Sequence, residues 1–217
     1  MLWMARLAPV PRAASPEIRR ALIERAAELL SRREPVTLRA LATATGVSTM
    51  AVYTYFDGMP GLWAAVRQEG FDRLHVRLSA LRPHRDPVRH LGTLGVVYLQ
   101  HALAEPALYR VMFDSTFDLP DPDGAAAPFE TLIAAADSAR SAGRFAADSD
   151  PLDMATRYWA NGHGLASLTL GGVLPVADLE RHAPATAVAL CTAAGDQPER
   201  ARRSVTAAWR GVQLSRA

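Results

Sequence analysis

The sequence predicts an all-α protein of about nine helices, and three observations support this fold class. Apolar residues recur at spacings of three and four in almost every stretch long enough to form an element. β-branched residues rarely alternate with polar ones, so no sheet is expected. Prolines and capping residues divide the chain into segments of ordinary helix length. With 217 residues, of which 49% are apolar, the chain can bury a core of normal size.

Residues 1–14 are expected to form a flexible arm before the first helix. Arg6, Pro9, Pro11 and Arg12 interrupt its apolar residues, so this stretch is too short and too broken for a signal peptide. No run of about 18 apolar residues occurs in the chain, and no membrane span is expected. The sequence therefore predicts a cytoplasmic protein.

Four helices are predicted in the N-terminal part of the chain. Ser15 can cap the first of them, and Pro16 suits the first helical turn. Arg82-Pro83 ends the last, because a residue that precedes proline avoids the α conformation. These helices are expected over residues 16 to about 33, 37–44, 48–55 and 60 to about 81.

Five helices are predicted in the C-terminal part. Residues 114–124 are expected to form an exposed acidic loop, and residues 173–195 show no clear element because Pro175, Pro184 and Gly195 interrupt them. The helices are expected over residues 87–104, 106–113, 126–142, 151–170 and 198–213.

Charge is distributed unevenly along the chain. All 24 basic residues are arginine, and the formal net charge is +2. Residues 1–90 hold 14 Arg and 8 acidic residues, whereas residues 91–217 hold 10 Arg and 14 acidic residues. The N-terminal part is therefore the one suited to a polyanion.

Residues 37–56 have the spacing of a helix-turn-helix unit. Counted from Leu38, Ala42 is at the fifth place, Gly46 at the ninth and Val52 at the fifteenth. A small side chain at Ala42 lets the two helices cross closely. Gly46 suits a turn that needs a positive φ, and Val52 packs the second helix onto the first. Such a unit places its second helix in the major groove of double-stranded DNA.

Residues 18–66 resemble the DNA-binding domain of TetR-family transcriptional regulators, a likeness carried by Ala26-Ala27, Leu30, Thr37, Leu41-Ala42, Gly46-Val47-Ser48, Tyr53, Tyr55-Phe56 and Leu62. Residues 106–113, together with Trp159 followed by His163-Gly164, resemble the branch of the family with a Trp-His-Gly signature. The resemblance implies a DNA-binding domain over residues 15–62 and a helical ligand-binding and dimerisation domain over residues 63–217.

The resemblance also implies which residues face DNA. Hydroxyl groups, one guanidinium and phenols suit phosphates or base edges, and small apolar side chains suit a thymine methyl. The residues expected at DNA are Thr37, Arg39, Ser48, Thr49, Met50, Ala51, Tyr53 and Tyr55.

One position departs from the family pattern. Where the family usually has a lysine at the start of the fourth helix, this chain has Met59. Positive charge for DNA is therefore expected from Arg39, the first helix, and Arg6 and Arg12 in the arm. Phe56 is expected in the core.

A cavity for a small, mostly apolar molecule is expected in the C-terminal domain. Its predicted lining combines aromatic bulk with few polar groups: Tyr98, His101, Tyr109, Met112, Phe113, Phe117, Phe129, Met154, Tyr158 and Asn161.

A homodimer interface is expected on two helices of the same domain. Trp159 and His163 are four residues apart and share a helix face, and glycine beside them allows another helix to approach. The residues expected in the interface are Trp159, His163, Gly164, Val205 and Trp209.

These features predict a homodimeric repressor that a small-molecule effector releases from a palindromic operator. Two alternatives remain: a DNA-binding regulator controlled by a protein partner, and a helical enzyme acting on small molecules. An enzyme is not expected, because no convergent set of titratable groups is seen. No cofactor is expected, and the histidines and the single Cys191 show no metal-ligand spacing.

Overall fold

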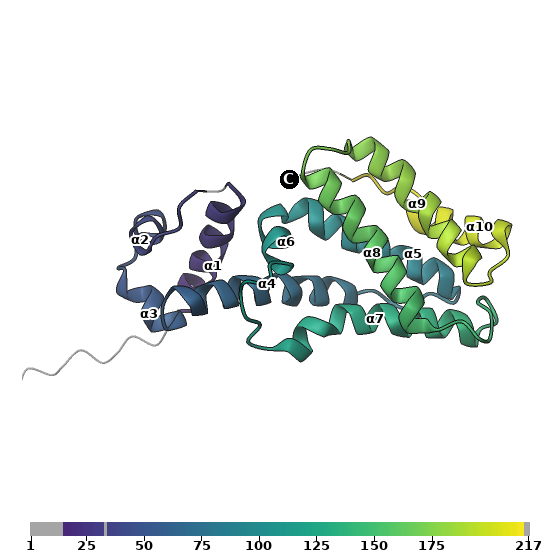
Figure 1. Cartoon of the computed structure of the whole chain (residues 1–217), viewed down its shortest axis with the longest axis horizontal. Coiled ribbons are helices and arrows are strands. Elements are labelled where there is room, and N and C mark those ends of the chain that lie inside the picture. The colour runs from purple at the N-terminus through teal and green to yellow at the C-terminus, as the bar shows by residue number, and fades with distance from the viewer. Residues whose placement is uncertain (1–14, 33, 215–217) are drawn as a thin grey trace, which may run out of the picture.

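The computed structural model describes residues 15–32 and 34–214, and this part of the chain is all-α (Figure 1). It contains ten helices and no strand, which confirms the predicted fold class. None of these helices is both long enough and apolar enough to cross a membrane. The helices are α1 (Pro16–Ser31), α2 (Leu38–Thr45), α3 (Met50–Phe56), α4 (Met59–Ser79), α5 (Pro87–Ala104), α6 (Pro106–Met112), α7 (Pro122–Ser141), α8 (Pro151–Leu170), α9 (Val176–Ala193) and α10 (Pro198–Trp209).

Helix α9 is the helix that the sequence did not predict. Pro184 lies inside it, where it removes one backbone hydrogen bond. Four buried residues at a spacing of four nevertheless form a continuous apolar stripe along the helix: Leu179, Ala183, Ala187 and Cys191. Burial of this stripe outweighs the cost of the proline, and the expectation of an irregular segment over residues 173–195 was wrong.

Several other boundaries differ from the prediction, and the end of α10, for example, is Trp209 instead of residue 213. Helix α7 begins at Pro122, because an Asp121 carboxylate oxygen caps it by accepting a hydrogen bond from the Gly124 N–H at 3.0 Å. The acidic loop is therefore shorter than expected. Helix α3 begins at Met50, with Thr49 as its N-cap.

The helix-turn-helix unit lies at one end of the molecule, where α1 and α4 pack against α2 and α3 (Figure 1). Gly46 ends α2 with a φ of 70°, as the sequence predicts. Leu41 and Val52 are fully buried between the helices, and Phe56 is buried beside them. Helix α4 continues from this end into the C-terminal part of the molecule.

Helix α6 packs into both hydrophobic clusters of the protein. Its Leu108 and Val111 belong to the cluster formed by α1–α4, whereas Tyr109 and Met112 belong to the larger cluster formed by α4–α10. The crossing of α4 and α6 is tight, since a Cβ added to Gly70 would lie 2.2 Å from Met112 Cγ. Glycine at this position is therefore required by the close approach of the two helices.

A buried ion-pair cluster holds the far end of the larger core together. Arg144, with a side chain only 2% exposed, donates from Nε and Nη2 to the two carboxylate oxygens of Asp196, at 2.9 and 2.6 Å. It also bonds Ser204 and Asp86, the N-cap of α5. Burial alone would raise the pKa of Asp86, but hydrogen bonds from Ser204 and a backbone N–H, with the Arg144 charge, bring it below its ordinary value.

His101 on α5 is the most deeply buried ionisable side chain near α4. It is fully buried, and neither ring nitrogen forms a hydrogen bond within the described residues. Burial lowers its pKa to about 4; the Glu105 charge opposes this shift, and the Arg77 and Arg73 charges reinforce it. The imidazole is therefore neutral at neutral pH.

We expect Asp196→Ala to lower the free energy of unfolding by about 3–5 kcal/mol, because it leaves the Arg144 charge buried without its bidentate partner. Urea denaturation measures the change. The control Asp137→Ala removes an exposed partner of Arg140 on α7 and should cost less than about 1 kcal/mol. Equal losses in the two variants would contradict a special role of the buried pair.

We expect the free energy of unfolding to decrease as the pH is lowered from 7 to 5, because of His101. Its folded pKa lies below the unfolded value, so only the unfolded chain binds a proton as the pH drops below about 6.5. The loss from this residue should reach about 2 kcal/mol between roughly pH 7 and pH 5. It should vanish in His101→Leu but persist in His182→Asn, whose side chain is exposed. Urea titrations at both pH values test this, and identical pH slopes in wild type and His101→Leu would refute it.

Candidate DNA-binding face and ligand cavity

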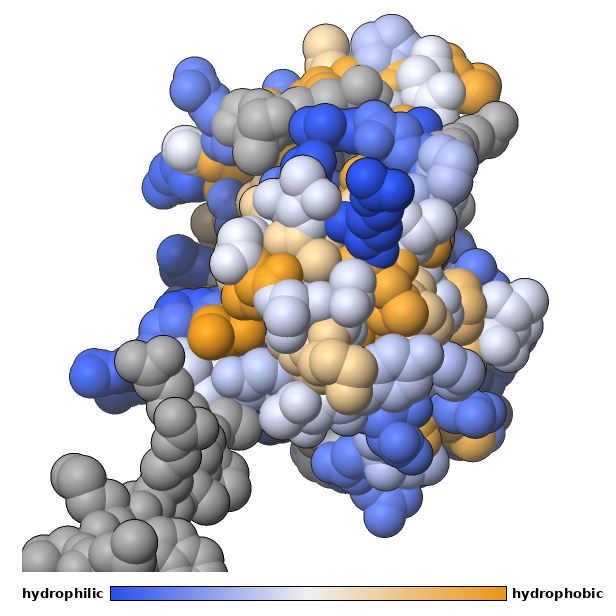
Figure 2. All heavy atoms as spheres, turned by 90° about the vertical axis from the view of Figure 1, so that its left-hand side faces the viewer, coloured by the Kyte–Doolittle hydropathy of each residue, from blue (hydrophilic) through white to orange (hydrophobic). Residues whose placement is uncertain are grey.

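The turn and helix α3 present a polar face to solvent at the end of the molecule that faces the viewer in Figure 2. Hydrophilic and intermediate side chains cover most of this end, with several separate hydrophobic patches. The exposed residues include Ser48 and Thr49, with Met50 at 64% exposure and Tyr53 at 50%. The buried Val52 and Phe56 on the opposite side of α3 hold this face outward.

Helix α2 adds two exposed residues at its N-terminus. The Thr37 hydroxyl caps the helix by accepting a hydrogen bond from the Ala40 N–H at 3.1 Å, and Arg39, two residues later, is exposed to solvent. A capped helix N-terminus beside a free-standing guanidinium has the charge that a phosphate requires.

Two of the eight residues expected at DNA are partly covered. Ala51 is half-buried, and the Tyr55 hydroxyl accepts a hydrogen bond from the Ser15 N–H at 2.8 Å. Tyr55 therefore links α3 to the start of α1. Met59 is half-buried and packs in the N-terminal cluster, which explains an apolar side chain at this position. Arg6 and Arg12 lie outside the described residues.

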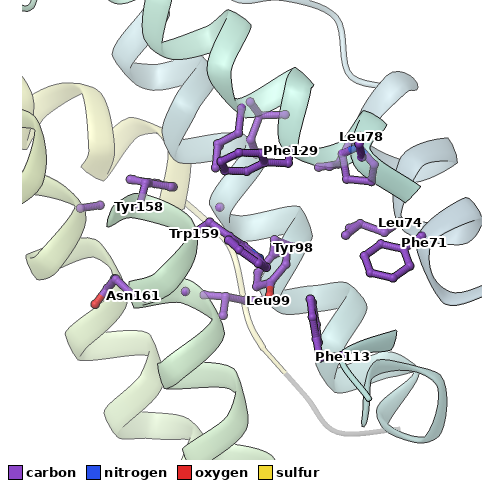
Figure 3. A pocket seen from close by; sticks show the side chains of 18 of the residues that line it. Phe71, Leu74, Leu78, Tyr98, Leu99, Phe113, Phe129, Tyr158, Trp159 and Asn161 are labelled. Atoms are coloured by element: carbon purple, nitrogen blue, oxygen red, sulfur yellow. The ribbon is translucent and has the colours of Figure 1, made fainter. Parts of the chain in front are cut away.

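A cavity of about 330 Å³ lies inside the C-terminal part, between α4, α5, α7 and α8 and next to α9 and α10 (Figure 3). Its size is at the lower end of the range for small-molecule sites, about 300–1,000 Å³. Aromatic side chains form much of the wall: Phe71, Tyr98, Phe113, Phe129, Tyr158, Trp159 and Trp209.

Half of the residues predicted to bind a ligand line this cavity: Tyr98, Phe113, Phe129, Tyr158 and Asn161. The other five lie elsewhere. His101 and Met154 are buried in the core, and Met112 packs under Gly70. Phe117 packs against Trp63 at a ring distance of 5.6 Å. Tyr109 lies behind Tyr98, outside the cavity wall.

Of the five residues predicted at a dimer interface, Val205 is buried within the protomer, whereas Trp159 remains 37% exposed and Trp209 is half-buried. Trp159 and Trp209 line the cavity, and Val205 is buried against Gly92 of α5. His163 is half-buried. Gly164 lies on open surface, since an added Cβ would have no atom within 4 Å.

The sequence-based prediction missed the contribution of α4 to the cavity. Arg67, Phe71, Leu74 and Leu78 all line it. Their spacing of four, three and four places them on one face of the helix. This helix face could have been recognised in the sequence, because Arg67 occupies a position where the apolar spacing of Phe71, Leu74 and Leu78 predicts another apolar residue.

A polar cluster supports the cavity wall behind Tyr98. The Tyr98 and Tyr109 hydroxyl oxygens lie 2.8 Å apart, and the Tyr109 hydroxyl lies 2.9 Å from His163 Nδ1. Burial raises the pKa of Tyr98 to about 12 and raises that of Tyr109 further, while burial lowers the pKa of His163. At neutral pH the phenols are protonated and the imidazole is neutral, so the cluster carries no net charge. It fixes the orientation of the Tyr98 ring.

Other chemistry is sparse in this region. Within residues 15–32 and 34–214, no group of three His, Cys, Asp or Glu side chains is arranged to hold a metal ion. The charged side chain that lines the cavity in this part of the chain is Arg67. The arrangement is suited to binding an organic molecule by shape and apolar contact.

The chain is similar to known proteins in sequence and in fold. Residues 91–190 match the family described as tetracyclin repressor-like, C-terminal domain. No curated protein sequence matches the chain significantly.

Several solved structures share the fold over nearly the whole chain. A protein of unknown function from Rhodococcus sp. RHA1 is 24% identical, with a TM-score of 0.67 over 88% of this chain and 100% of that one. CprB, a TetR-family protein from S. coelicolor A3(2), is 22% identical, with a TM-score of 0.68 over 89% and 97%. RolR in complex with resorcinol is 18% identical, with a TM-score of 0.58 over 91% and 95%. The chain thus has the fold of the TetR-family regulators, and its residues 91–190 match the C-terminal domain of that family.

Proposed function

We propose that this chain is a TetR-family transcriptional regulator, a repressor that a small apolar molecule releases from a palindromic operator. The observation that carries the proposal is the combination, in one chain, of an exposed helix-turn-helix face and an internal apolar cavity, joined by α4. The cavity favours control by a small molecule over control by a protein partner. The resorcinol complex of the structurally similar RolR supports the same class of effector.

We divide the chain into a DNA-binding domain over residues 15–62 and a ligand-binding and dimerisation domain over residues 63–217. The two hydrophobic clusters follow this division except at Ala65, Val66, Leu108 and Val111, which pack in the N-terminal cluster. We assign DNA contact to the exposed residues Thr37, Arg39, Ser48, Thr49, Met50 and Tyr53, with Ala51 and Tyr55 at the edge of the face. Two such faces, related by a two-fold axis, would read half-sites about one helical turn apart.

The outer face of α8 and α9 is the surface that we assign to the homodimer. Small side chains make it flat: Ala160 and Gly164 on α8, and Ala185 and Ala189 on α9 are open to solvent. Leu168 adds an apolar side chain that is 45% exposed. Small residues let a second pair of helices approach closely. We also place the chain in the branch with the Trp-His-Gly signature, on the residues Trp159, His163 and Gly164.

A ligand can control DNA binding only if it binds one protomer arrangement better than the other. The structure offers a direct route, because α4 lines the cavity with its middle and begins beside α3. Helix α6 packs on the same stretch of α4 and on α1. A change in cavity shape that moves α4 or α6 would therefore change the distance between the two recognition helices of a dimer.

We expect binding to a palindrome from the region upstream of the protein's own gene to weaken steeply with salt, because phosphate contacts release counterions. Arg39→Gln should reduce the log–log salt slope by about one and weaken binding to all sequences. Fluorescence anisotropy across a salt series measures both. Arg157→Gln, which alters an exposed arginine on α8, is the control and should leave the slope unchanged. A flat slope for the wild type would refute DNA binding by this face.

We expect the wild type to be a dimer at micromolar concentration and Leu168→Arg to be a monomer, because a charge would be buried in the interface. Sedimentation velocity distinguishes the two states. Val76→Arg introduces the same charge at an exposed apolar position on α4 and should remain dimeric. A monomeric wild type, or a fully dimeric Leu168→Arg variant, would show that the interface lies elsewhere.

A further inference from the structure

We propose that the effector is an amphipathic carboxylic acid whose carboxylate pairs with Arg67 while its apolar body fills the cavity. The inference rests on the regulatory function proposed above and names the chemical class of the molecule that the cavity takes. It starts from the one charged side chain that the described residues contribute to the cavity wall.

The charge of Arg67 is not neutralised by an acidic partner. Its Nε donates to the Met112 carbonyl at 3.1 Å, and its Nη1 donates to the Phe117 carbonyl. Both partners are neutral backbone oxygens. Hydrogen bonds from Thr116 hold the pKa of Asp114 low and the more distant Arg67 charge adds to this, but the two side chains form no ion pair among the described residues.

Other partly buried arginines are paired differently. Arg73 and Arg77 on the same helix each pair with Glu105, at 2.6 and 2.8 Å. Arg144 pairs with Asp196 and Asp86. Arg67 therefore keeps an uncompensated positive charge at the edge of an apolar cavity, where a carboxylate would be attracted far more strongly than in water.

The hydroxyl and amide side chains of the wall are already engaged. The Tyr158 hydroxyl donates to the Leu91 carbonyl at 3.3 Å, and the Tyr98 hydroxyl bonds that of Tyr109. The Asn161 amide donates to the Thr186 hydroxyl. No Asp or Glu lines the cavity in the part of the chain that is described, so a cationic ligand would meet a like charge without a counter-charge. The wall is complementary to an anion with an apolar body.

The position of Arg67 links such a ligand to α6. Met112 is the last residue of α6, and Phe117 follows in the segment that leads to α7. A carboxylate on the guanidinium would compete with these carbonyls and loosen the hold of α4 on the end of α6. Since α6 packs in both hydrophobic clusters, binding would favour a different arrangement of the two domains.

Tryptophan fluorescence tests the proposal directly, because Trp159 and Trp209 line the cavity. The probes are octanoate and 4-phenylbutyrate, each compared with its primary amide at neutral pH. We expect the acids to bind wild type at least about tenfold more tightly than the amides, as is typical of charge-assisted hydrogen bonds. This comparison needs no variant and is unaffected by changes in folding.

Three variants then assign the preference to one side chain. In Arg67→Gln the acid and the amide should bind equally, whereas Arg67→Lys, which keeps the charge, should retain part of the preference. Arg77→Gln removes an arginine from the same helix outside the cavity and should behave as wild type. Thermal melting followed by circular dichroism confirms that each variant is folded.

Three results would overturn the proposal: equal binding of acid and amide to wild type, a preference that survives Arg67→Gln, or no saturable binding of either acid at millimolar concentration. None of these measurements uses DNA. Failure of the regulatory function would appear instead as an absence of salt-dependent operator binding by the wild type without any probe, so the two failures are distinguishable.

Discussion

Helix α6 must satisfy two hydrophobic cores at once, and the arrangement of the rest of the protein depends on this constraint. Of its seven residues, four are buried, Pro106 and Ala107 are half-buried, and Arg110 alone is exposed. Leu108 and Val111 are held by α1 and α4, while Tyr109 and Met112 are held by the larger core. A shift of α6 therefore cannot improve the packing of one core without changing that of the other.

Polar contacts fix both ends of α6 to α4. At its N-terminus, Glu105 pairs with Arg73 and Arg77, and at its C-terminus, Met112 accepts a hydrogen bond from Arg67. The first contact is a full ion pair, whereas the second is a charge held by neutral carbonyls. A bound anion would therefore displace the Arg67–carbonyl contact more readily than the Glu105 ion pairs. The more easily displaced contact is the one at the cavity.

The opposite end of the larger core is built for rigidity. Arg144, Asp196, Asp86 and Ser204 join the start of α5, the turn after α7 and the start of α10 in one buried cluster. Removal of Arg144 or Asp196 would leave the charge of its buried partner uncompensated, so this pair ties the segments together.

Local sequence patterns were sufficient to predict the helix-turn-helix unit, because Gly46, Leu41 and Val52 act within about fifteen residues of one another. They were not sufficient for the C-terminal part. Periodicity identified Trp159 and Val205 as apolar, but it cannot tell whether an apolar face meets its own chain or a partner: in the structure Val205 is buried within the protomer, while Trp159 lines the cavity and stays 37% exposed. Helix α9 was not predicted because Pro184 interrupts its pattern. Its buried residues can be recognised as a stripe only once the helices that pack on them are known. Arg67 reaches the cavity through tertiary packing, which spacing along one helix does not show.

The length of α4 amplifies small motions at its middle. The crossing with α6 at Gly70 is about 11 residues from the start of α4, or roughly 16 Å along the helix axis. A tilt of about 5° around this crossing would displace the start of α4, and α3 with it, by roughly 1.4 Å. In the two-fold dimer proposed above, the displacements of the two protomers would add. A sub-ångström adjustment at the cavity would then become a mismatch of nearly 3 Å between the recognition helices, about the rise of one base pair.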